Sequence, residues 1–295
     1  ILYRPFDERW IFYHEAVLER SRTEVMRHMI KDNIGLITVR QVAEGNFSHV
    51  FVSDSIVESR ITLSNKGIGF LFPLYLYIDA NKPSKKKTFG LMLFEPKASY
   101  FVKKPNINET LLKNLAASYA NQPSPEEIFY YIYAVLYSEI YRIKYAEFLK
   151  IDFPRVPFTK DYKLFKKMSE YGNRLVELHL LKSSELNLPI SRLHGEKDNR
   201  IEKLKYDEKA GLLYINTIQY FEGISKDVWS YQIGGYQVCD KWLKDRKKRI
   251  LSLDEIQTYC RIVTTIQKTI EIQKAIDLIF DKLELEILTV ASEAS

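Results

Sequence analysis

The stretch Ser124-Pro-Glu-Glu-Ile-Phe-Tyr-Tyr-Ile-Tyr-Ala-Val-Leu-Tyr-Ser-Glu-Ile140 carries a strong helix signal. Ser124 is a favoured N-cap residue, Pro125 suits the first helical position, and Glu127 completes a capping box. Apolar residues then recur at helical spacing through Ile140 and on toward Leu149. We therefore predict one long helix from Pro125 toward Leu149, around which the fold is organised.

This predicted helix carries six tyrosines: Tyr130, Tyr131, Tyr133, Tyr137, Tyr141 and Tyr145. Tyrosine rings around a helix could stack on nucleic-acid bases. More commonly such rings cover an apolar core while their hydroxyls reach water. We favour the packing interpretation.

Further helices are predicted on both sides of this stretch. Residues 108–121 form a short helix, and residues 161–181 form a longer one that turns Leu164, Met168, Leu175 and Leu178 inward. Between the tyrosine-rich helix and the longer one, two prolines keep residues 151–158 extended. Ser252 and Glu255 form a second capping box, which opens a helix of about 33 residues, roughly 50 Å long.

Runs rich in β-branched and aromatic residues predict strands at 34–39, 50–52, 70–78 and 91–94, and a hairpin at 201–206 with 212–215. The predicted fold class is α+β: a mixed strand and loop region braced by several helices, with a long C-terminal helix. We expect one domain over residues 1–250, strand-rich over 1–105, helical over 106–185, and with a hairpin and helix over 190–250. A C-terminal helical arm over 251–295 completes the chain; because it is acidic, we expect it to pack on protein.

The charge of the chain is segregated along its length, although the net charge is only +6. Residues 82–104 hold seven lysines against one Glu95, and residues 241–249 hold six basic residues against Asp245. The last 44 residues hold eight acids and four bases. Segregated positive charge favours a polyphosphate partner, because each neutralised phosphate releases a counterion. Solvated lysine-rich loops are the alternative, and the basic turn 81–87 fits either a groove-entering finger or an ordinary hairpin.

Catalytic motifs are missing from the sequence. It has no Pro-Pro pair, which the Asn/Asp-Pro-Pro-aromatic motif of amino-group methyltransferases requires, no Gly-rich cofactor loop, and no P-loop. A metal-dependent nuclease would need an acidic residue followed later by Asp/Glu-x-Lys. Asp152 with Asp161-x-Lys163 could be fitted to this pattern, and so could Asp207-x-Lys209, but such triplets arise by chance in a chain with 28% charged residues. The five histidines lack metal-ligand spacing. We expect no catalytic residue, no metal site and no cofactor on this chain.

The remaining composition excludes other classes. With 46% apolar and 28% charged residues the chain is typical of globular proteins. It has no apolar run long enough to cross a membrane, so we expect no membrane partner. Its only cysteines, Cys239 and Cys260, are too few for a disulfide framework and are predicted to be buried helix residues in a reducing cytoplasm. Since the chain starts at Ile1 rather than Met, we expect a fragment whose preceding part is missing.

Three stretches resemble one protein family. Tyr3-Arg-Pro-Phe-Asp-Glu-Arg-Trp10 is similar to the segment that follows the methyltransferase core in fused DNA N6-adenine methyltransferases of restriction–modification systems. The segments from Pro125 to Tyr133 and from Phe153 to Phe158 resemble the middle of the Type ISP C-terminal specificity domain. Trp229-Ser-Tyr-Gln-Ile-Gly-Gly-Tyr-Gln-Val-Cys-Asp-Lys-Trp-Leu-Lys-Asp-Arg246 resembles its last third and is the most distinctive of the three. The stretch from Pro154 to Leu181 is also, more weakly, similar to the end of Type I specificity domains.

The resemblance implies a bacterial DNA target-recognition domain. In this family one polypeptide joins a nuclease, an ATP-driven translocase, a methyltransferase and the recognition domain. The implied partners are double-stranded DNA and the upstream methyltransferase domain, on which the C-terminal helix is expected to dock. S-adenosylmethionine, with ATP and Mg²⁺, is implied for the parent enzyme rather than for this chain. The recognition domain would hold duplex DNA while the methyltransferase flips out an adenine.

Candidate contacts with DNA fall into two sets. Base readout is expected from loop residues whose side chains match base edges in the major groove: Arg40, Gln41, Asn46, Asn65, Asn81, Arg192, Asn199 and Arg200. Phosphate contacts are expected from a second group: Lys85, Lys86, Lys87, Lys103, Lys104, Lys244, Arg246, Lys247 and Lys248. Within the family stretch we expect Trp229 and Trp242 to be packed, and Gly234 and Gly235 to allow a close backbone approach.

The alternative hypothesis assigns the chain a function that does not involve binding DNA. The chain could be a helical protein-interaction module that couples other domains through its tyrosine-rich and acidic helices, with basic patches that are only solvated surface.

Overall fold

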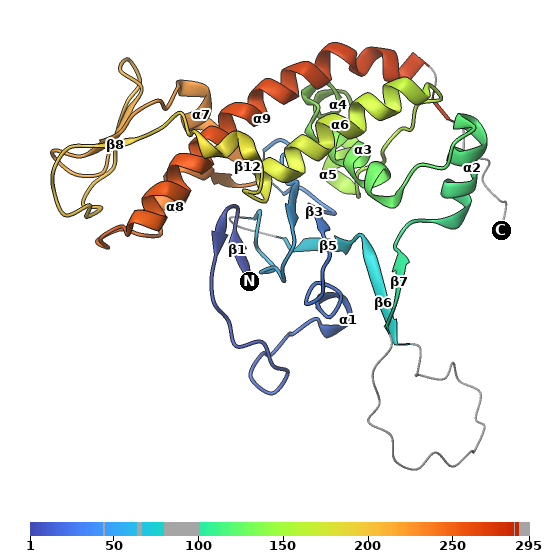
Figure 1. The fold of residues 1–295 in the computed structure, drawn as a ribbon, viewed down its shortest axis with the longest axis horizontal. Coiled ribbons are helices and arrows are strands. Elements are labelled where there is room, and N and C mark those ends of the chain that lie inside the picture. The colour runs from blue at the N-terminus through green and yellow to red at the C-terminus, as the bar shows by residue number, and fades with distance from the viewer. Residues whose placement is uncertain (44, 64–66, 80–100, 286, 289–295) are drawn as a thin grey trace.

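The computed structural model describes residues 1–43, 45–63, 67–79, 101–285 and 287–288. It shows a helical layer stacked on several small antiparallel sheets, which confirms the α+β class (Figure 1). The longer helices are α2 (Glu109–Tyr119), α3 (Pro125–Tyr137), α6 (Tyr162–His179) and α9 (Leu253–Leu285). Shorter helical elements are α1 (Thr23–Met26), α4 (Glu139–Lys144), α5 (Ala146–Ile151), η1 (Ser184–Asn187), α7 (Lys226–Ser230) and α8 (Val238–Lys244).

Helices α3 and α6 pack closely because glycine stands at their contact. A Cβ atom added at Gly172 of α6 would lie 1.8 Å from the carbonyl oxygen of Tyr130 in α3. The Ser124 capping box at the start of α3 forms as predicted, with the Glu127 amide donating to Ser124 Oγ at 3.1 Å. The Asp161 side chain caps α6. Local start signals and one close approach therefore fix this helix pair.

The single helix predicted from Pro125 toward Leu149 is wrong, because the chain breaks at Ser138 and again at Tyr145. Ser138 is extended (φ −63°, ψ 127°) and becomes the N-cap of α4, accepting from the Tyr141 amide. Its hydroxyl donates to Asp277 of α9 at 2.6 Å. The helix therefore ends where Ser138 bonds to a residue 139 positions away, and no pattern in the neighbouring sequence predicts this contact.

Helix α9 forms most of the predicted C-terminal arm. Helix α9 opens at the predicted Ser252 capping box and runs for 33 residues, but it packs on the chain's own helices α3, α4, α6, α7 and α8. Its first half contributes Tyr259, Val263 and Ile266 to one hydrophobic core, and its second half contributes Ile276 and Phe280 to another. Residues 253–285 therefore contribute to both hydrophobic cores of the chain, and docking of this helix on an upstream domain stays a prediction.

Within the described ranges the strands form five small sheets. They are β1 (Leu2–Arg4) with β2 (Asp7–Glu8); β4 (Phe51–Ser53), β3 (Gly35–Val39) and β5 (Gly69–Pro73); β6 (Tyr75–Asp79) with β7 (Phe101–Pro105); β8 (Leu193–His194), β11 (Tyr220–Phe221), β10 (Leu212–Tyr214) and β9 (Lys205–Asp207); and β12 (Gln232–Ile233) with β13 (Tyr236–Gln237). The strand predicted over 70–78 is divided at Leu74 between two sheets. The hairpin predicted near 201–215 is confirmed as β9–β10, and the predicted strand 91–94 lies outside the described residues.

The tyrosines of α3 and α4 pack in the core rather than facing a ligand. Tyr131, Tyr133, Tyr137 and Tyr141 are at most 1% exposed. The Tyr137 hydroxyl donates to the carbonyl of Val50, and the Tyr131 hydroxyl to that of Pro157. The packing interpretation is therefore confirmed for these four, with polar partners inside the protein instead of water.

His179 is buried in the same core and makes folding sensitive to acid. Its ring nitrogens lie 2.7 Å from the Tyr133 hydroxyl and 2.9 Å from Thr269 Oγ1. Burial, with a smaller effect from Arg142, lowers the pKa of His179 to about 3 from its ordinary 6.5. Because the unfolded chain binds this proton and the folded chain does not, the stability present above pH 6.5 is lost as pH falls toward 3.

We expect the free energy of unfolding to decrease by about 1.4 kcal/mol per pH unit from His179 in this window. Urea unfolding at pH 7, 6 and 5 measures the slope. Replacing His179 with Gln, which keeps a donor and an acceptor, is expected to reduce the slope by one proton. An unchanged slope in that variant would show that His179 already titrates normally in the folded state.

Candidate nucleic-acid interface

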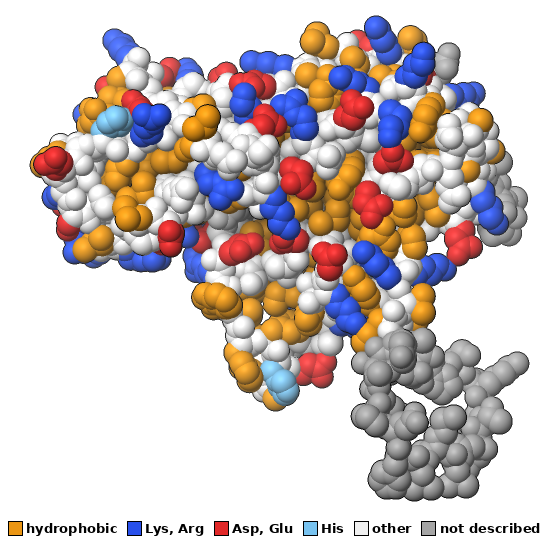
Figure 2. All heavy atoms as spheres, viewed as in Figure 1, with side chains coloured by type: hydrophobic (Ala, Val, Ile, Leu, Met, Phe, Trp, Pro, Cys, Tyr) orange, Lys and Arg blue, Asp and Glu red, His pale blue; other side chains and the backbone are white. Residues whose placement is uncertain are grey.

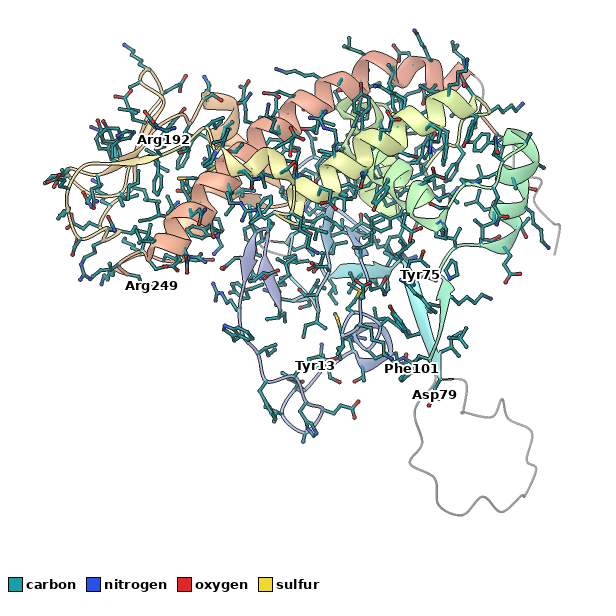
Figure 3. The ribbon with its side chains drawn as sticks, in the orientation of Figure 1. Tyr13, Tyr75, Asp79, Phe101, Arg192 and Arg249 are labelled. Atoms are coloured by element: carbon teal, nitrogen blue, oxygen red, sulfur yellow. The ribbon has the colours of Figure 1, made fainter. Side chains whose placement is uncertain are left out.

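Strands β6 and β7 form a two-stranded antiparallel ribbon that projects from the side of the body opposite α9 (Figure 1). Its register pairs Tyr75 with Pro105 and Asp79 with Phe101. We call these two strands the β6–β7 ribbon. Figure 3 shows Tyr75 at the base of the ribbon, with Phe101 and Asp79 at its outer end.

Two buried side chains hold the outer edge of β6. The Asn33 side chain accepts from the Tyr75 amide at 3.1 Å and donates to the Tyr75 carbonyl at 2.8 Å, as a neighbouring strand would. His28 Nδ1 accepts from the Tyr77 amide at 2.9 Å. Three backbone groups at the base of β6 are therefore paired on this side, and residues 28–33 help to set the direction in which the ribbon leaves the body.

Cations cover the aromatic rings of the ribbon. Lys103 Nζ lies 4.1 Å from the ring centre of Tyr75, and Lys31 Nζ lies 3.0 Å from that of Phe101. Lys104 pairs with Glu109 at the start of α2 and, through that hydrogen bond, lowers the pKa of the Glu109 carboxyl. Lys103 and Lys104 were predicted from their own segment. Lys31 was missed, because it reaches Phe101 from 70 positions away in the sequence.

A second basic region forms where residues 199–201 meet residues 248–251. The Arg200 guanidinium donates to the Lys248 carbonyl at 2.9 Å, and the Leu251 amide donates to the Asn199 carbonyl at 3.0 Å. Lys244, Lys247, Lys248 and Arg249 are all exposed there. Lys244 pairs with Asp240 at 2.6 Å, and Arg249 pairs with Glu255 at 2.9 Å. Figure 3 shows Arg249 on a part of the molecule separate from Phe101, so the predicted phosphate contacts are divided between two regions.

Arg246 does not fit its predicted phosphate contact. Its side chain is only 10% exposed, and its guanidinium lies 2.7 Å from Asp7 Oδ1 and 3.1 Å from Glu255 Oε1. It also stacks over the ring of Trp242, 3.5 Å from the ring centre. All three nitrogens of its guanidinium donate hydrogen bonds inside the chain, to Glu255, the Trp242 carbonyl and Asp7, and so join β2 to α8 and α9.

The glycines of the family stretch approach this chain's own backbone. Gly234 has φ +58°, and a Cβ atom there would lie 1.9 Å from the carbonyl oxygen of Thr62. The amides of Gly234 and Gly235 donate to the carbonyls of Ser48 and Thr62, both at 2.9 Å. The close approach predicted here therefore fastens the β12–β13 hairpin onto the N-terminal sheet region. We find no reason to assign it to phosphate binding.

The tryptophans of this stretch pack, as predicted. Trp242 is 3% exposed and donates to the Phe6 carbonyl at 3.2 Å. Trp229 is half-buried and stacks on Tyr206 with ring centres 4.9 Å apart.

The candidates for base readout lie in different settings. Gln41, Asn46 and Arg192 are exposed, and Arg40 Nε is 3.5 Å from an oxygen of Asp152. The predicted Asn65, Asn81, Lys85, Lys86 and Lys87 lie outside the described residues.

Asn199 and Arg200 are engaged by their own loop. The Asn199 side-chain oxygen accepts from buried Gln219 at 2.7 Å, in a turn with φ +58°. The Arg200 guanidinium contacts Asp198 in addition to the Lys248 carbonyl. We therefore regard these two residues as shaping the loop, and we keep Arg40, Gln41, Asn46 and Arg192 as the readout candidates.

Charge alone does not mark the interface. On the face shown in Figure 2, Lys and Arg side chains are interspersed with Asp and Glu. Among the described residues no group of three or more His, Cys, Asp or Glu side chains is arranged to hold a metal ion. Cys239 and Cys260 are buried free thiols, as predicted.

None of the helices in the described ranges combines the length and the apolar character that crossing a membrane requires.

Solved structures share this fold. Over 93% of this chain, the ATP-dependent Type ISP restriction-modification enzyme LlaBIII, solved bound to DNA, superposes with a TM-score of 0.70 and 20% identity. A nuclease-deletion mutant of the Type ISP enzyme LlaGI, in complex with a DNA substrate mimic, superposes on 93% of this chain with a TM-score of 0.65 and 20% identity. A DrdV–DNA complex superposes on 92% of it with a TM-score of 0.72 and 21% identity. The chain spans only 18%, 24% and 27% of those three chains, respectively.

Sequence comparison identifies the family. A search of curated protein sequences finds no match. The model of the Type ISP C-terminal specificity domain, in contrast, matches residues 1–275, which confirms the resemblance carried by the three stretches. The chain belongs to the family of Type ISP C-terminal specificity domains.

Proposed function

We propose that this chain is the duplex-DNA recognition module of a bacterial restriction–modification enzyme. It holds the target in the cytoplasm while other parts of the parent polypeptide carry out adenine methylation and restriction. The observation that most supports this proposal is the β6–β7 ribbon, which projects from the body of a chain that belongs to a specificity-domain family. A two-stranded ribbon fits the major groove, and Lys31, Lys103 and Lys104 supply cations beside it.

The chemistry is assigned to the rest of the parent polypeptide. The three solved chains are about three and a half to five times as long as this chain, which leaves room for other domains. S-adenosylmethionine, ATP and Mg²⁺ would bind there, because the sequence of this chain contains neither a Gly-rich cofactor loop nor a P-loop.

The alternative hypothesis, a helical module that couples other domains, relied on the tyrosine-rich helix and the acidic helix as its binding surfaces. Its tyrosine-rich helix places Tyr131, Tyr133 and Tyr137 in the core. Its acidic helix, α9, packs its apolar face on five helices of the same chain. The residues on which that hypothesis rested are therefore used largely within the domain's own packing.

Reversing the ribbon charges is expected to weaken binding to every duplex. In Lys103→Glu with Lys104→Glu, two cations that we assign to phosphates become repulsive, so the salt slope of log K should flatten by roughly 2. Fluorescence anisotropy against salt measures this slope. The matched control is Lys274→Glu with Lys282→Glu on exposed positions of α9, which should change the slope little. If the two double variants changed the salt slope equally, the ribbon would not be part of the DNA interface.

Replacing a base-reading side chain should act differently. In Arg192→Ala or Gln41→Ala, we expect relaxed preference at one base pair, worth about 1–3 kcal/mol, with overall duplex affinity largely kept. Binding to a library of single-base variants of the target measures the preference. If every position keeps its preference, the readout lies on other side chains.

A further inference from the structure

The loop of residues 9–22 projects from the body with its apolar side chains turned outward. Trp10 is fully exposed, and Phe12 and Val17 are 73% and 64% exposed. Figure 2 shows hydrophobic side chains gathered on this projection. Three large apolar side chains in eight residues are more than the scattered exposure usual for a surface, and such clusters mark interaction sites.

The loop is held in shape by its polar groups. The Tyr13 hydroxyl donates to the Ser21 carbonyl, and Thr23 Oγ1 donates to Glu15 at 2.7 Å. The Ala16 amide donates to His14 Nδ1 at 3.1 Å. Polar groups are therefore bonded within the loop while its apolar side chains face outward, which is the reverse of an ordinary surface loop.

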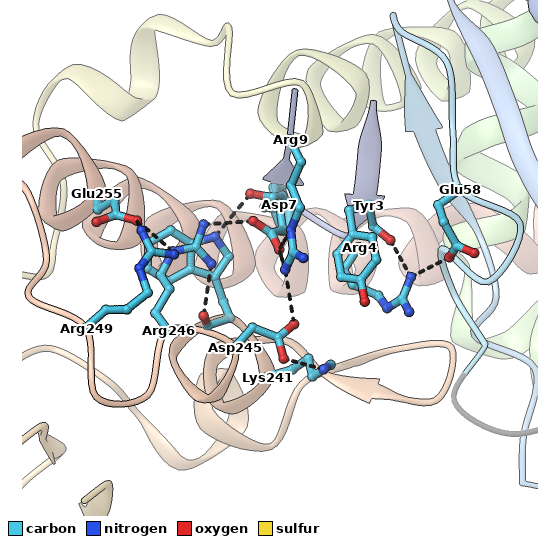
Figure 4. Close-up of polar contacts among 12 residues, drawn as sticks. Tyr3, Arg4, Asp7, Arg9, Glu58, Lys241, Asp245, Arg246, Arg249 and Glu255 are labelled. Atoms are coloured by element: carbon cyan, nitrogen blue, oxygen red, sulfur yellow. Dashed lines mark hydrogen bonds and ion pairs between the residues drawn. The ribbon is translucent and has the colours of Figure 1, made fainter. Parts of the chain in front are cut away.

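The base of the loop is fixed to the domain. The Arg9 guanidinium pairs with Asp7 at 2.8 Å and lies over the ring of Tyr3, 3.6 Å from its centre. Asp7 is held in turn by Arg246 at 2.7 Å (Figure 4). The loop therefore leaves a firm support directly after β2.

The charge of this region favours a protein partner over DNA. Residues 8–27 contain four acids (Glu8, Glu15, Glu19, Glu24) and four bases (Arg9, Arg20, Arg22, Arg27). Without net positive charge there is little counterion release to drive binding to phosphates. An aromatic tip of this kind is instead typical of the centre of a protein–protein interface, where Trp and Phe are enriched and charges are depleted.

We propose that Trp10 and Phe12 insert into an apolar recess on the methyltransferase-bearing part of the same polypeptide. The inference rests on the proposed function for the identity of that part. The family is described as a C-terminal specificity domain, so we place the methyltransferase-bearing part before β1, and the loop begins only a few residues beyond β1. Covalent linkage provides the high effective concentration that lets a small contact persist.

Hydrogen–deuterium exchange on the full-length polypeptide tests the docking. Within the described part of the chain, no hydrogen bond uses the amides of Trp10, Ile11 or Phe12, so an undocked tip should exchange at the intrinsic rate. We expect at least tenfold slower exchange of peptides covering residues 10–13, already in the absence of DNA. Exchange at the intrinsic rate would overturn the proposal. Protection that appears only when a 30-base-pair duplex is added would assign the tip to DNA and overturn it as well.

A variant pair gives an independent readout. In Trp10→Ala with Phe12→Ala, proteolytic cleavage between this domain and the preceding part should become at least tenfold faster, because two interface anchors are removed. The control is Leu278→Ala, an 83% exposed position on α9, which should leave cleavage unchanged. Equal cleavage in both would contradict docking. Duplex affinity measured on the same proteins tests the proposed function separately, since neither docking readout requires DNA binding.

Discussion

Replacing Arg246 with Ala is expected to lower the free energy of unfolding by about 3–5 kcal/mol. The change would leave the Asp7 carboxylate, whose side chain is 3% exposed, without its buried cation. It would also remove a planar group stacked on Trp242. Urea unfolding followed by tryptophan fluorescence measures the loss.

Two further variants separate this structural role from a phosphate contact. Lys247→Ala, at the exposed neighbouring position, is expected to change stability by less than about 0.5 kcal/mol. Arg246→Met combined with Asp7→Asn should recover part of the lost stability, because no unpaired charge remains. If Arg246→Ala instead kept full stability and reduced only duplex affinity, the assignment of Arg246 to the interior would be wrong.

Gly172→Ala is expected to destabilise the domain by about 3 kcal/mol, against the trend for helices. In an exposed helix this exchange stabilises by about 1 kcal/mol, because glycine is a poor helix former. Here the new Cβ atom would meet the Tyr130 carbonyl at 1.8 Å, and only a separation of α3 from α6 relieves that clash. The midpoint of urea unfolding should fall while its slope stays constant.

The control for this prediction lies on the same helix. Glu170→Ala changes an exposed position of α6 and should leave the midpoint nearly unchanged. A stabilised Gly172→Ala protein would mean that α3 and α6 are farther apart than described.

Features decided by neighbouring residues could be predicted from the sequence. The capping boxes at Ser124 and Ser252 form at the predicted positions, since each needs only a residue three places along. The β9–β10 hairpin follows equally from its own segment. The three family stretches were sufficient to identify the specificity domain, which the family model confirms.

Features decided by distant partners could not be predicted. The break at Ser138 depends on Asp277, and the burial of Arg246 depends on Asp7, 239 residues earlier. Arg246 stands in a run of basic residues, so the local sequence predicted a phosphate contact for it just as for its exposed neighbour Lys247. In the same way, nothing near Lys31 indicates that it meets Phe101 on the ribbon.

The central claim is that this chain binds duplex DNA, and a salt titration tests it most directly. Fluorescence anisotropy would compare the parent polypeptide with and without residues 1–295, using a random 30-base-pair duplex and its matching single strand. We predict that the complete polypeptide binds the duplex more tightly than the single strand, that its affinity falls steeply with salt, and that deletion of this chain removes most of that affinity. Equal duplex affinity and salt slope with and without the chain would contradict the account.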